Sequence, residues 1–231
     1  MVAAYEILGL VERLYAAAAG ADPWGQAVAA IVASLGGEGG GLIVQDPTGS
    51  AHYEATLVGI APEFQRSYRP LITAADMRPV WRRLTRLLPA RGIVDESIGG
   101  GSDFDRTAFN QQWLRPQRID HYVMSLIAPD PSQVAFLVVT RSADKGCFDA
   151  DAMAAIEMLR PHLGQAIQLR SRLDSAGRER ASTLAALDRI DRGVLLLDAE
   201  GRVRHANRLA DAILREGDGL LAEAGRLICE H

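Results

Sequence analysis

Two neighbouring segments in the middle of the chain alternate their side chains residue by residue, and only a short turn separates them. They read IDHYVMSLI and QVAFLVVTR, with PDPS as the turn. Alternation with a period of two residues is typical of a β-strand, whose side chains point to two opposite faces. Tyr122 and Met124 are therefore expected on one face, and Val123 and Ile127 on the other. Both faces carry apolar side chains. Other elements must therefore cover both sides of the sheet to which this hairpin belongs.

The first 35 residues predict two amphipathic helices. Gly20 ends the first helix, Asp22 stands where the N-cap of the second belongs, and Pro23 takes its first helical position. Apolar side chains recur at helical spacing in both segments. In the first they are Ile7, Leu8, Val11, Leu14, Tyr15 and Ala18, and in the second Trp24, Val28, Ile31, Val32 and Leu35.

The next segment predicts a hairpin followed by several short helices. The glycine run Gly36–Gly41 is expected to be a flexible connector into the strand GLIVQD, which pairs with HYEATLVG across the turn DPTGS. From Pro62 to Arg91 three prolines interrupt a helical pattern, so two or three short helices are expected. GIVDES is expected to be a brief strand. Ser102 or Asp103 is expected to cap a helix that reads FDRTAFNQQWL.

Some forty residues from Cys147 to Ile190 carry one helical pattern. Pro161 is expected to kink this helix, and Ser175-Ala176-Gly177 to loosen it. A helix longer than about 25 residues is unusual inside a compact domain and favours a connector or a dimer seam. We therefore predict a homodimer that is joined partly along the apolar stripe of this helix. The candidate interface residues are Met153, Ile156, Leu159, Leu163 and Ile167.

The order of these elements predicts an α+β fold, with an antiparallel sheet flanked by helices. We expect a sensor domain over residues 1–172, a connector helix over 173–190 and an incomplete domain over 191–231. The last part contains GVLLLDAEGRVRHANRLADAIL, a pattern of strand, turn, strand and helix. We expect it to be the opening of a domain that the seventeen residues after Leu214 do not complete.

Two stretches resemble known families. FDRTAFNQQWLRPQRIDHYVMSLIAPDPSQVAFLVVTRS, followed by FDADAMAAIEMLRPHLGQAI, resembles the second half of the GAF-like sensor domains of bacterial LuxR-type transcription regulators. This likeness extends more weakly back to Met1. LDAEGRVRHANRLADAIL is similar to the start of a PAS domain, in which Asn207 takes the position of an asparagine that often caps the next helix. In such regulators a helix-turn-helix DNA-binding domain follows, so the resemblance implies the sensory part of one.

Charge and composition narrow the classes of partner. The formal net charge of −4 gives no general attraction to nucleic acid or to an anionic membrane. The arginines of LRPHLGQAIQLRSRLDSAGRERAS have no aromatic residues between them and are expected to line a solvated helix face. We expect DNA binding only through a domain beyond this chain, and no membrane association. The two cysteines fit a reducing cytoplasm, where we expect the protein to be located.

The sequence has no spacing typical of a catalytic or metal site. Its five histidines have no evident carboxylate or cysteine partner. Cys147 precedes a helix whose N-terminus can lower the pKa of a thiol, yet an unreactive cysteine is the favoured reading. Asp103 and Asp105 suit a helix N-terminus better than a pair of catalytic carboxylates. We therefore predict a protein that is not an enzyme and has no cofactor or metal.

A set of aromatic residues predicts a pocket. They fall on elements that would meet over one sheet face of a GAF-like fold, beneath a loop-rich lid from Trp81 to Trp113. Ordinary core packing explains each residue singly, whereas a small-molecule site needs the same apolar lining with a few polar groups, here Tyr53, Arg115 and Ser125. Arg115 would suit an aromatic or acyl ligand with an anionic group. The candidate ligand-binding residues are Tyr53, Trp81, Phe104, Phe109, Trp113, Arg115, Tyr122, Met124 and Phe136.

The sequence thus predicts the ligand-sensing, dimerising region of a transcription regulator whose DNA-binding domain lies outside this chain. Two alternatives stay open. One is the sensor input module of a histidine kinase or cyclase-type signalling protein, since GAF and PAS modules serve those proteins too. The other is an interaction or scaffold domain that binds no ligand because its pocket is filled by side chains.

Overall fold

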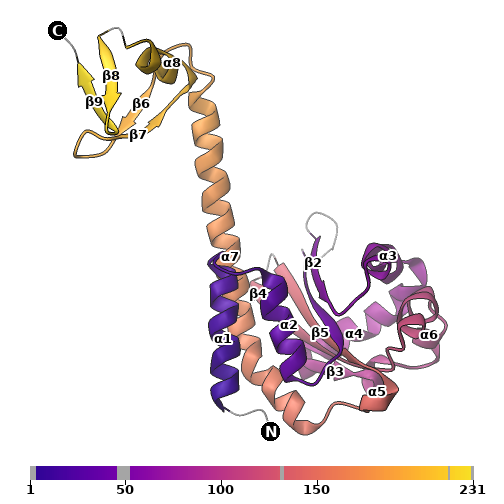
Figure 1. Ribbon diagram of the computed structural model, residues 1–231. Coiled ribbons are helices and arrows are strands. Elements are labelled where there is room, and N and C mark those ends of the chain that lie inside the picture. The colour runs from indigo at the N-terminus through magenta and orange to yellow at the C-terminus, as the bar shows by residue number, and fades with distance from the viewer. Residues whose placement is uncertain (1–3, 46–52, 131–132, 218, 230–231) are drawn as a thin grey trace. The chain divides into compact units, whose positions relative to one another are not determined.

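The computed structural model describes residues 4–45, 53–130, 133–217 and 219–229 (Figure 1). It divides into two compact units, Met1–Ser171 and Arg172–His231, and each is described by itself below. The expected turn DPTGS lies outside the described residues. Among the described residues, no helix combines the length and the apolar character that crossing a bilayer requires.

A five-stranded antiparallel sheet forms the centre of the first unit, with the strand order β2-β1-β5-β4-β3. Its central hairpin pairs Tyr122 with Thr140 and Met124 with Val138. The predicted first hairpin is also present. The α+β fold class expected from the sequence is therefore confirmed. The strands are β1 (Gly39–Gln45), β2 (Tyr53–Val58), β3 (Ile93–Asp95), β4 (His121–Asp130) and β5 (Gln133–Arg141).

Three helices cover one face of this sheet, namely α1 (Ala4–Ala18), α2 (Trp24–Ser34) and the first part of α7 (Ala150–Leu187) (Figure 1). Val123 and Ile127 of β4 point into the core between them, as the alternation predicted. Two details differ from the prediction. Leu8 is 69% exposed, because the buried stripe of α1 follows Ile7, Leu10 and Leu14. Helix α2 begins at Trp24, with Pro23 and not Asp22 as its N-cap residue.

The opposite face is covered by a group of short helices that we call the roof (Figure 1). The roof consists of α3 (Pro62–Ile72), η1 (Ala75–Met77), α4 (Arg78–Arg91), α6 (Ser102–Asp105), and the π-helical turn η2 (Asn110–Leu114). Of the remaining short elements, α5 (Glu96–Gly99) follows β3, η3 (Arg115–Gln117) precedes β4, and η4 (Ala143–Lys145) follows β5. The prediction of several short helices between Pro62 and Arg91 is confirmed.

The expected single helix FDRTAFNQQWL is wrong, because the segment breaks after α6. The hydroxyl of Thr107 donates to the carbonyl oxygen of Phe104 at 2.7 Å and accepts from the N–H of Asn110 at 3.1 Å, and these bonds compete with a continuous helix. Neither Ser102 nor Asp103 caps α6, since the N-cap residue is Gly101 and no side chain bonds there. Asp103 pairs with Arg106 at 3.0 Å instead.

The glycine run is not the flexible connector that was expected, because β1 begins at Gly39 and its glycines are buried. A Cβ atom on Gly40 would overlap the carbonyl oxygen of Val138, and one on Gly41 would lie 2.6 Å from Cδ2 of Leu57. Glycine is present here because the neighbouring strands approach too closely for any side chain.

The long helix is confirmed, since α7 continues from Ala150 to Leu187 with Pro161 inside it. Its apolar stripe, however, does not form a seam free for a second chain. Leu159 and Leu163 are fully buried in the core beneath the sheet, Ile156 and Ile167 are at most 4% exposed, and Met153 packs at the margin. This corrects the expected dimer interface, because the stripe is covered by its own unit. The homodimer itself stays a prediction.

The second unit contains the predicted strand, turn, strand and helix. Strand β6 (Leu195–Leu197) pairs with β7 (Val203–Ala206), helix α8 (Arg208–Glu216) follows, and β8 (Leu220–Glu223) pairs with β9 (Arg226–Cys229). Asn207 is the N-cap of α8, as the sequence predicted, and its side-chain oxygen accepts from the N–H of Ala210 at 3.0 Å.

Candidate ligand-binding site

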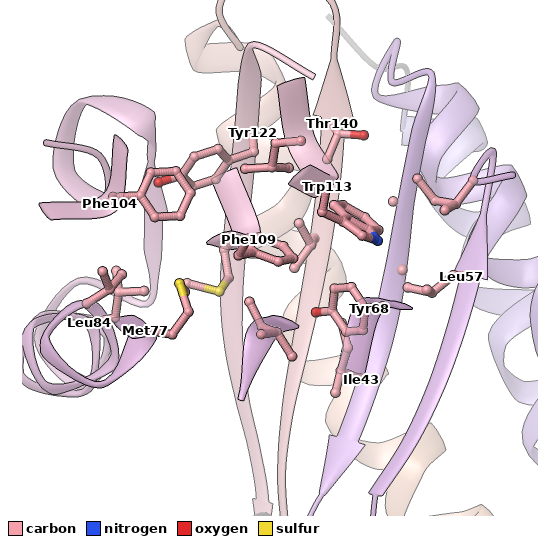
Figure 2. Close-up of a pocket in the computed structure, with 18 of the residues that line it drawn as sticks. Ile43, Leu57, Tyr68, Met77, Leu84, Phe104, Phe109, Trp113, Tyr122 and Thr140 are labelled. Carbon is pink, nitrogen blue, oxygen red and sulfur yellow. The ribbon is translucent and has the colours of Figure 1, made fainter. Parts of the chain in front are cut away.

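A small cavity lies between the sheet and the roof (Figure 2). Its volume is about 80 Å³, and almost every side chain that lines it is apolar. The sheet contributes Gly40, Gly41, Ile43, Leu57, Tyr122, Met124, Val138 and Thr140. The roof and the residues next to it contribute Ile60, Tyr68, Ile72, Met77, Val80, Trp81, Leu84, Phe104, Phe109, Trp113 and Leu114.

Side chains of β4 and β5 that point toward the roof form the floor of this cavity. Tyr122 and Met124 point away from the core under α7 because they are out of phase with Val123 and Ile127. Val138 lies opposite Met124 in the sheet and points to the same side. The glycines Gly40 and Gly41 continue the floor and present only backbone to the cavity.

Aromatic rings form much of the cavity wall. Phe109 and Trp113 stack with ring centroids 5.1 Å apart and planes inclined by 15°, and Tyr68 meets Trp113 edge to face at 5.2 Å. The ring centroids of Phe104 and Tyr122 lie 5.8 Å apart on the other side of the cavity (Figure 2). Such pairs add about 0.5–1.5 kcal/mol each beyond the burial of their area, so the wall is a packed aromatic layer.

Two indole groups fasten the roof through their N–H donors. Trp113 Nε1 donates to the carbonyl oxygen of Phe64 at 2.7 Å, and Trp81 Nε1 donates to that of Ile72 at 2.9 Å. Both acceptors belong to α3, so η2 and α4 are each bonded to the same helix. The indole N–H of each tryptophan is therefore hydrogen-bonded within the roof, while its ring lines the cavity.

The hydroxyl groups of Tyr68 and Tyr122 differ from the indole donors. Among the described parts of the chain, nothing accepts a hydrogen bond from either hydroxyl. Burial raises the pKa of both phenols, so both are protonated donors at neutral pH. Within the described residues that line the cavity, no side chain is charged.

A second, more polar cavity of about 380 Å³ adjoins the first. Ile60 and Thr140 line both cavities. The polar wall includes Glu38, whose carboxylate accepts from the N–H of Ser142 at 2.7 Å, and this bond lowers the pKa of Glu38. The apolar cavity thus has a polar neighbour at one end.

Six of the nine ligand-binding candidates line the apolar cavity: Trp81, Phe104, Phe109, Trp113, Tyr122 and Met124. In particular, Tyr122 and Trp113 both line this cavity.

The remaining candidates lie elsewhere. Phe136 packs behind Trp81, with ring centroids 5.6 Å apart, and Tyr53 lies beneath the guanidinium of Arg69 at 4.5 Å. Arg115 is exposed, and its Nε donates to Asn110 Oδ1 at 3.2 Å. Ser125 points to the other side of the sheet, where alternation puts it. The expected anchor for an anionic group is therefore wrong.

Several lining residues escaped the sequence prediction. Tyr68 and Ile72 lie one helical turn apart on α3, a spacing that was visible but was assigned only to helix formation. Met77 and Thr140 carried no signal, because their position depends on how the roof folds back over β5. Gly40 and Gly41 were visible only as a loop-like run.

The histidine prediction also needs correction at one position. Nδ1 of His121 lies 2.7 Å from Oε1 of Glu96 and 3.5 Å from Sγ of Cys147, so this histidine has both a carboxylate and a cysteine partner. The hydrogen bond to Glu96 raises the pKa of the Cys147 thiol, opposite to the lowering expected from a helix N-terminus.

No protein-family model and no curated protein matches this chain. Among solved structures, the VqsR ligand-binding domain from Pseudomonas aeruginosa is 16% identical, with a TM-score of 0.49 over 73% of this chain and 96% of that one. CepR2 from Burkholderia cenocepacia, titled an N-acylhomoserine lactone dependent LuxR family transcription factor, is 16% identical, with a TM-score of 0.48 over 73% and 98%. Escherichia coli SdiA is 15% identical, with a TM-score of 0.44 over 66% and 63%. With TM-scores below 0.5, these likenesses are too distant to assign a family.

Proposed function

We propose that the first unit binds a small, mainly apolar molecule in the cavity beneath the roof, and that the chain is the ligand-sensing region of a transcription regulator. The observation that carries the binding proposal is the pair of unpartnered hydroxyls on Tyr68 and Tyr122. A hydrogen bond to one of these hydroxyls contributes about 0.5–1.5 kcal/mol. A ligand that supplies acceptors to these donors gains this contribution, and its apolar part contacts the aromatic wall.

The chemistry of the lining selects the ligand class. Because the phenols are protonated donors and the described lining carries no charge, the ligand should offer neutral acceptors, such as the oxygens of an amide or ester. Its apolar part should be an acyl chain or an aromatic ring. An anionic group is not favoured, since Arg115 is exposed outside the cavity.

The size of the cavity makes binding depend on the roof. Sites for drug-sized ligands measure about 300–1,000 Å³, whereas this cavity has about 80 Å³. A ligand of more than a few atoms must therefore move roof side chains outward or extend past Ile60 and Thr140 into the polar cavity. Binding and roof position are thus coupled, which is what a sensor requires.

The regulatory part of the proposal is supported by the sequence resemblance and by α7. This helix starts in the core of the first unit and continues in sequence to Leu187. A domain that binds DNA, a homodimer and a cytoplasmic location belong to the same proposal. The resemblance of GVLLLDAEGRVRHANRLADAIL to a PAS domain is part of it too.

The binding proposal is tested with hydroxyl-deletion variants. A graded series of neutral N-alkyl amides and benzamides is titrated while the fluorescence of Trp81 and Trp113 is followed. We expect at least one member to bind, and Tyr68→Phe or Tyr122→Phe to weaken it about tenfold, because one hydrogen bond contributes about 0.5–1.5 kcal/mol.

The matched control is Tyr53→Phe, which removes a buried, unpartnered hydroxyl that lies outside the cavity. This control should leave affinity unchanged. Binding that is equally insensitive to all three substitutions, or no binding by any amide, would contradict the proposal.

A further inference from the structure

Three side chains with metal-binding atoms converge where β3 ends and β4 begins, and His121 lies on the face of β4 away from the cavity. They are Glu96 at the start of α5, His121 at the start of β4 and Cys147 in the segment before α7. One donor atom from each lies within 4.8 Å of the other two. We call these three residues the polar cluster.

Strand pairing explains why residues so distant in sequence meet here. β3 pairs with β4 so that Asp95 lies opposite Val123, which puts Glu96 beside His121. On the other side of β4, His121 lies opposite Arg141. Arg141 Nη1 donates to the carbonyl oxygen of Cys147 at 3.1 Å and so holds the cysteine near the histidine. Strand pairing and the Arg141 side chain thus bring the three residues together independently of contacts within the cluster.

The geometry does not fit a catalytic triad. In a triad the nucleophile and the acid contact different nitrogens of the histidine ring, so that a proton is taken from one side while the other side is oriented. Here Oε1 of Glu96 and Sγ of Cys147 both approach the same atom, Nδ1 of His121, at 2.7 and 3.5 Å. Donors that converge on one point are arranged for a shared cation.

We propose that Glu96, His121 and Cys147 bind a Zn²⁺ ion through Oε1, Nδ1 and Sγ. Tetrahedral Zn²⁺ with bonds of about 2.3 Å to sulfur and 2.0–2.1 Å to nitrogen places those two atoms about 3.5 Å apart. The observed separation is 3.5 Å. The carboxylate oxygen would need about 3.3 Å from the nitrogen by the same geometry, so Glu96 must withdraw slightly from its 2.7 Å hydrogen bond.

The donor set selects this class of metal. One thiolate, one imidazole and one carboxylate suit Zn²⁺ and related divalent transition metals, whereas Ca²⁺ and Mg²⁺ require oxygen ligands. Oε2 of Glu96 accepts from the N–H of Tyr122 at 3.2 Å, and this bond orients the carboxylate as outer partners of metal ligands do. Three protein ligands leave the fourth position to water, and Cys147 is exposed, so the ion can exchange with solvent.

The test uses the reduced chain without an affinity tag. Zn²⁺ is titrated by calorimetry, and Co²⁺ serves as a spectroscopic probe whose thiolate charge-transfer absorption reports a cysteine ligand. We expect one ion per chain and a thiolate band. Cys147→Ser should abolish the band and weaken Zn²⁺ binding by at least about tenfold, the low end of what even the loss of an outer partner costs.

Cys229→Ser is the matched control, because Cys229 is the other exposed free cysteine of the described chain. It should keep both the band and the affinity. Glu96→Gln should weaken binding while the thiolate band persists. Since Cys147 is exposed, Cys147→Ser should unfold at the same temperature as wild type, which separates lost ligation from lost folding. An absent thiolate band in the wild type, or a band that survives in Cys147→Ser, would overturn the proposal.

Discussion

At the scale of single residues, Asn207 organises the second unit. It is fully buried, and its side chain makes four hydrogen bonds. The amide nitrogen donates to the carbonyl oxygens of Leu187 and Arg192 at 2.9 and 2.8 Å. The oxygen accepts from the N–H groups of Val194 and Ala210 at 2.9 and 3.0 Å. One side chain therefore joins the end of α7 to β6 and α8.

Replacing Asn207 should loosen all of these segments together. We expect Asn207→Ala to destabilise the second unit by about 2 kcal/mol or more, since it removes a helix cap and leaves buried groups unpaired. Hydrogen exchange of the Val194 and Ala210 amides should accelerate in parallel. Asn207→Asp, which keeps the acceptor, should protect these amides better than Asn207→Ala. Unchanged exchange in Asn207→Ala would show that other contacts hold the unit.

Glycine substitutions should have opposite effects at two positions. Gly41→Ala should cost about 1–3 kcal/mol, because its Cβ would lie 2.6 Å from Leu57 in the cavity floor. Gly177→Ala should stabilise the chain by about 1 kcal/mol, since Gly177 lies within α7 and a Cβ there meets nothing within 4 Å. Denaturant unfolding measures both. A Gly41→Ala protein as stable as wild type would mean that the floor can yield.

At residue scale, the sequence predicted what alternation determines and missed what tertiary pairing determines. Tyr122 and Met124 were assigned to the cavity side because a strand has only two faces. Arg115 was misplaced because nearness to Trp113 in sequence does not fix the direction of its side chain, which is exposed at the start of η3. The partners of His121 could not be seen, since β-pairing brings Glu96 and Cys147 to it from opposite sides in the sequence.

At the scale of elements, the sequence predicted the helix α7 but not the surface that covers its apolar stripe. The length and the stripe of α7 were predicted. The covering surface could not be predicted, because α1, α2 and α7 share one sheet face only in the folded unit. The roof illustrates the same limit: its short helices were expected from the prolines, but their closure over Met124 and Val138 depends on long-range packing.

The two kinds of apolar residue on α7 should respond differently to charge. Leu163→Glu should destabilise the first unit by about 3 kcal/mol or more, because Leu163 is fully buried. Leu173→Glu should leave the unfolding temperature nearly unchanged, since Leu173 is 47% exposed. Thermal unfolding followed by circular dichroism distinguishes them. If Leu163→Glu folds normally and only changes the sedimentation coefficient, the stripe is an interface after all.

At the scale of the whole molecule, the order of elements and the α+β class followed from periodicity and turn residues. The division into Met1–Ser171 and Arg172–His231 lies within α7, so one helix belongs to both units in sequence. The sensor domain expected from the sequence ends at residue 172, and this boundary stays a prediction. The cavity could be anticipated as a place, through its aromatic residues, but its volume depends on packing that no local pattern encodes.

The hydrogen bonds from Trp81 and Trp113 to α3 also affect the kinetics of ligand binding. A ligand that is too large for the 80 Å³ cavity and does not extend into the polar cavity enters when α4 and η2 separate from α3. Its association rate should then level off at the rate of roof opening as ligand concentration rises, with lid motions of this kind taking microseconds to milliseconds. Release waits for the same opening. A sensor of this kind responds to the ligand concentration averaged over the residence time of the ligand. Fluctuations of the concentration that are shorter than this time leave the bound fraction almost unchanged.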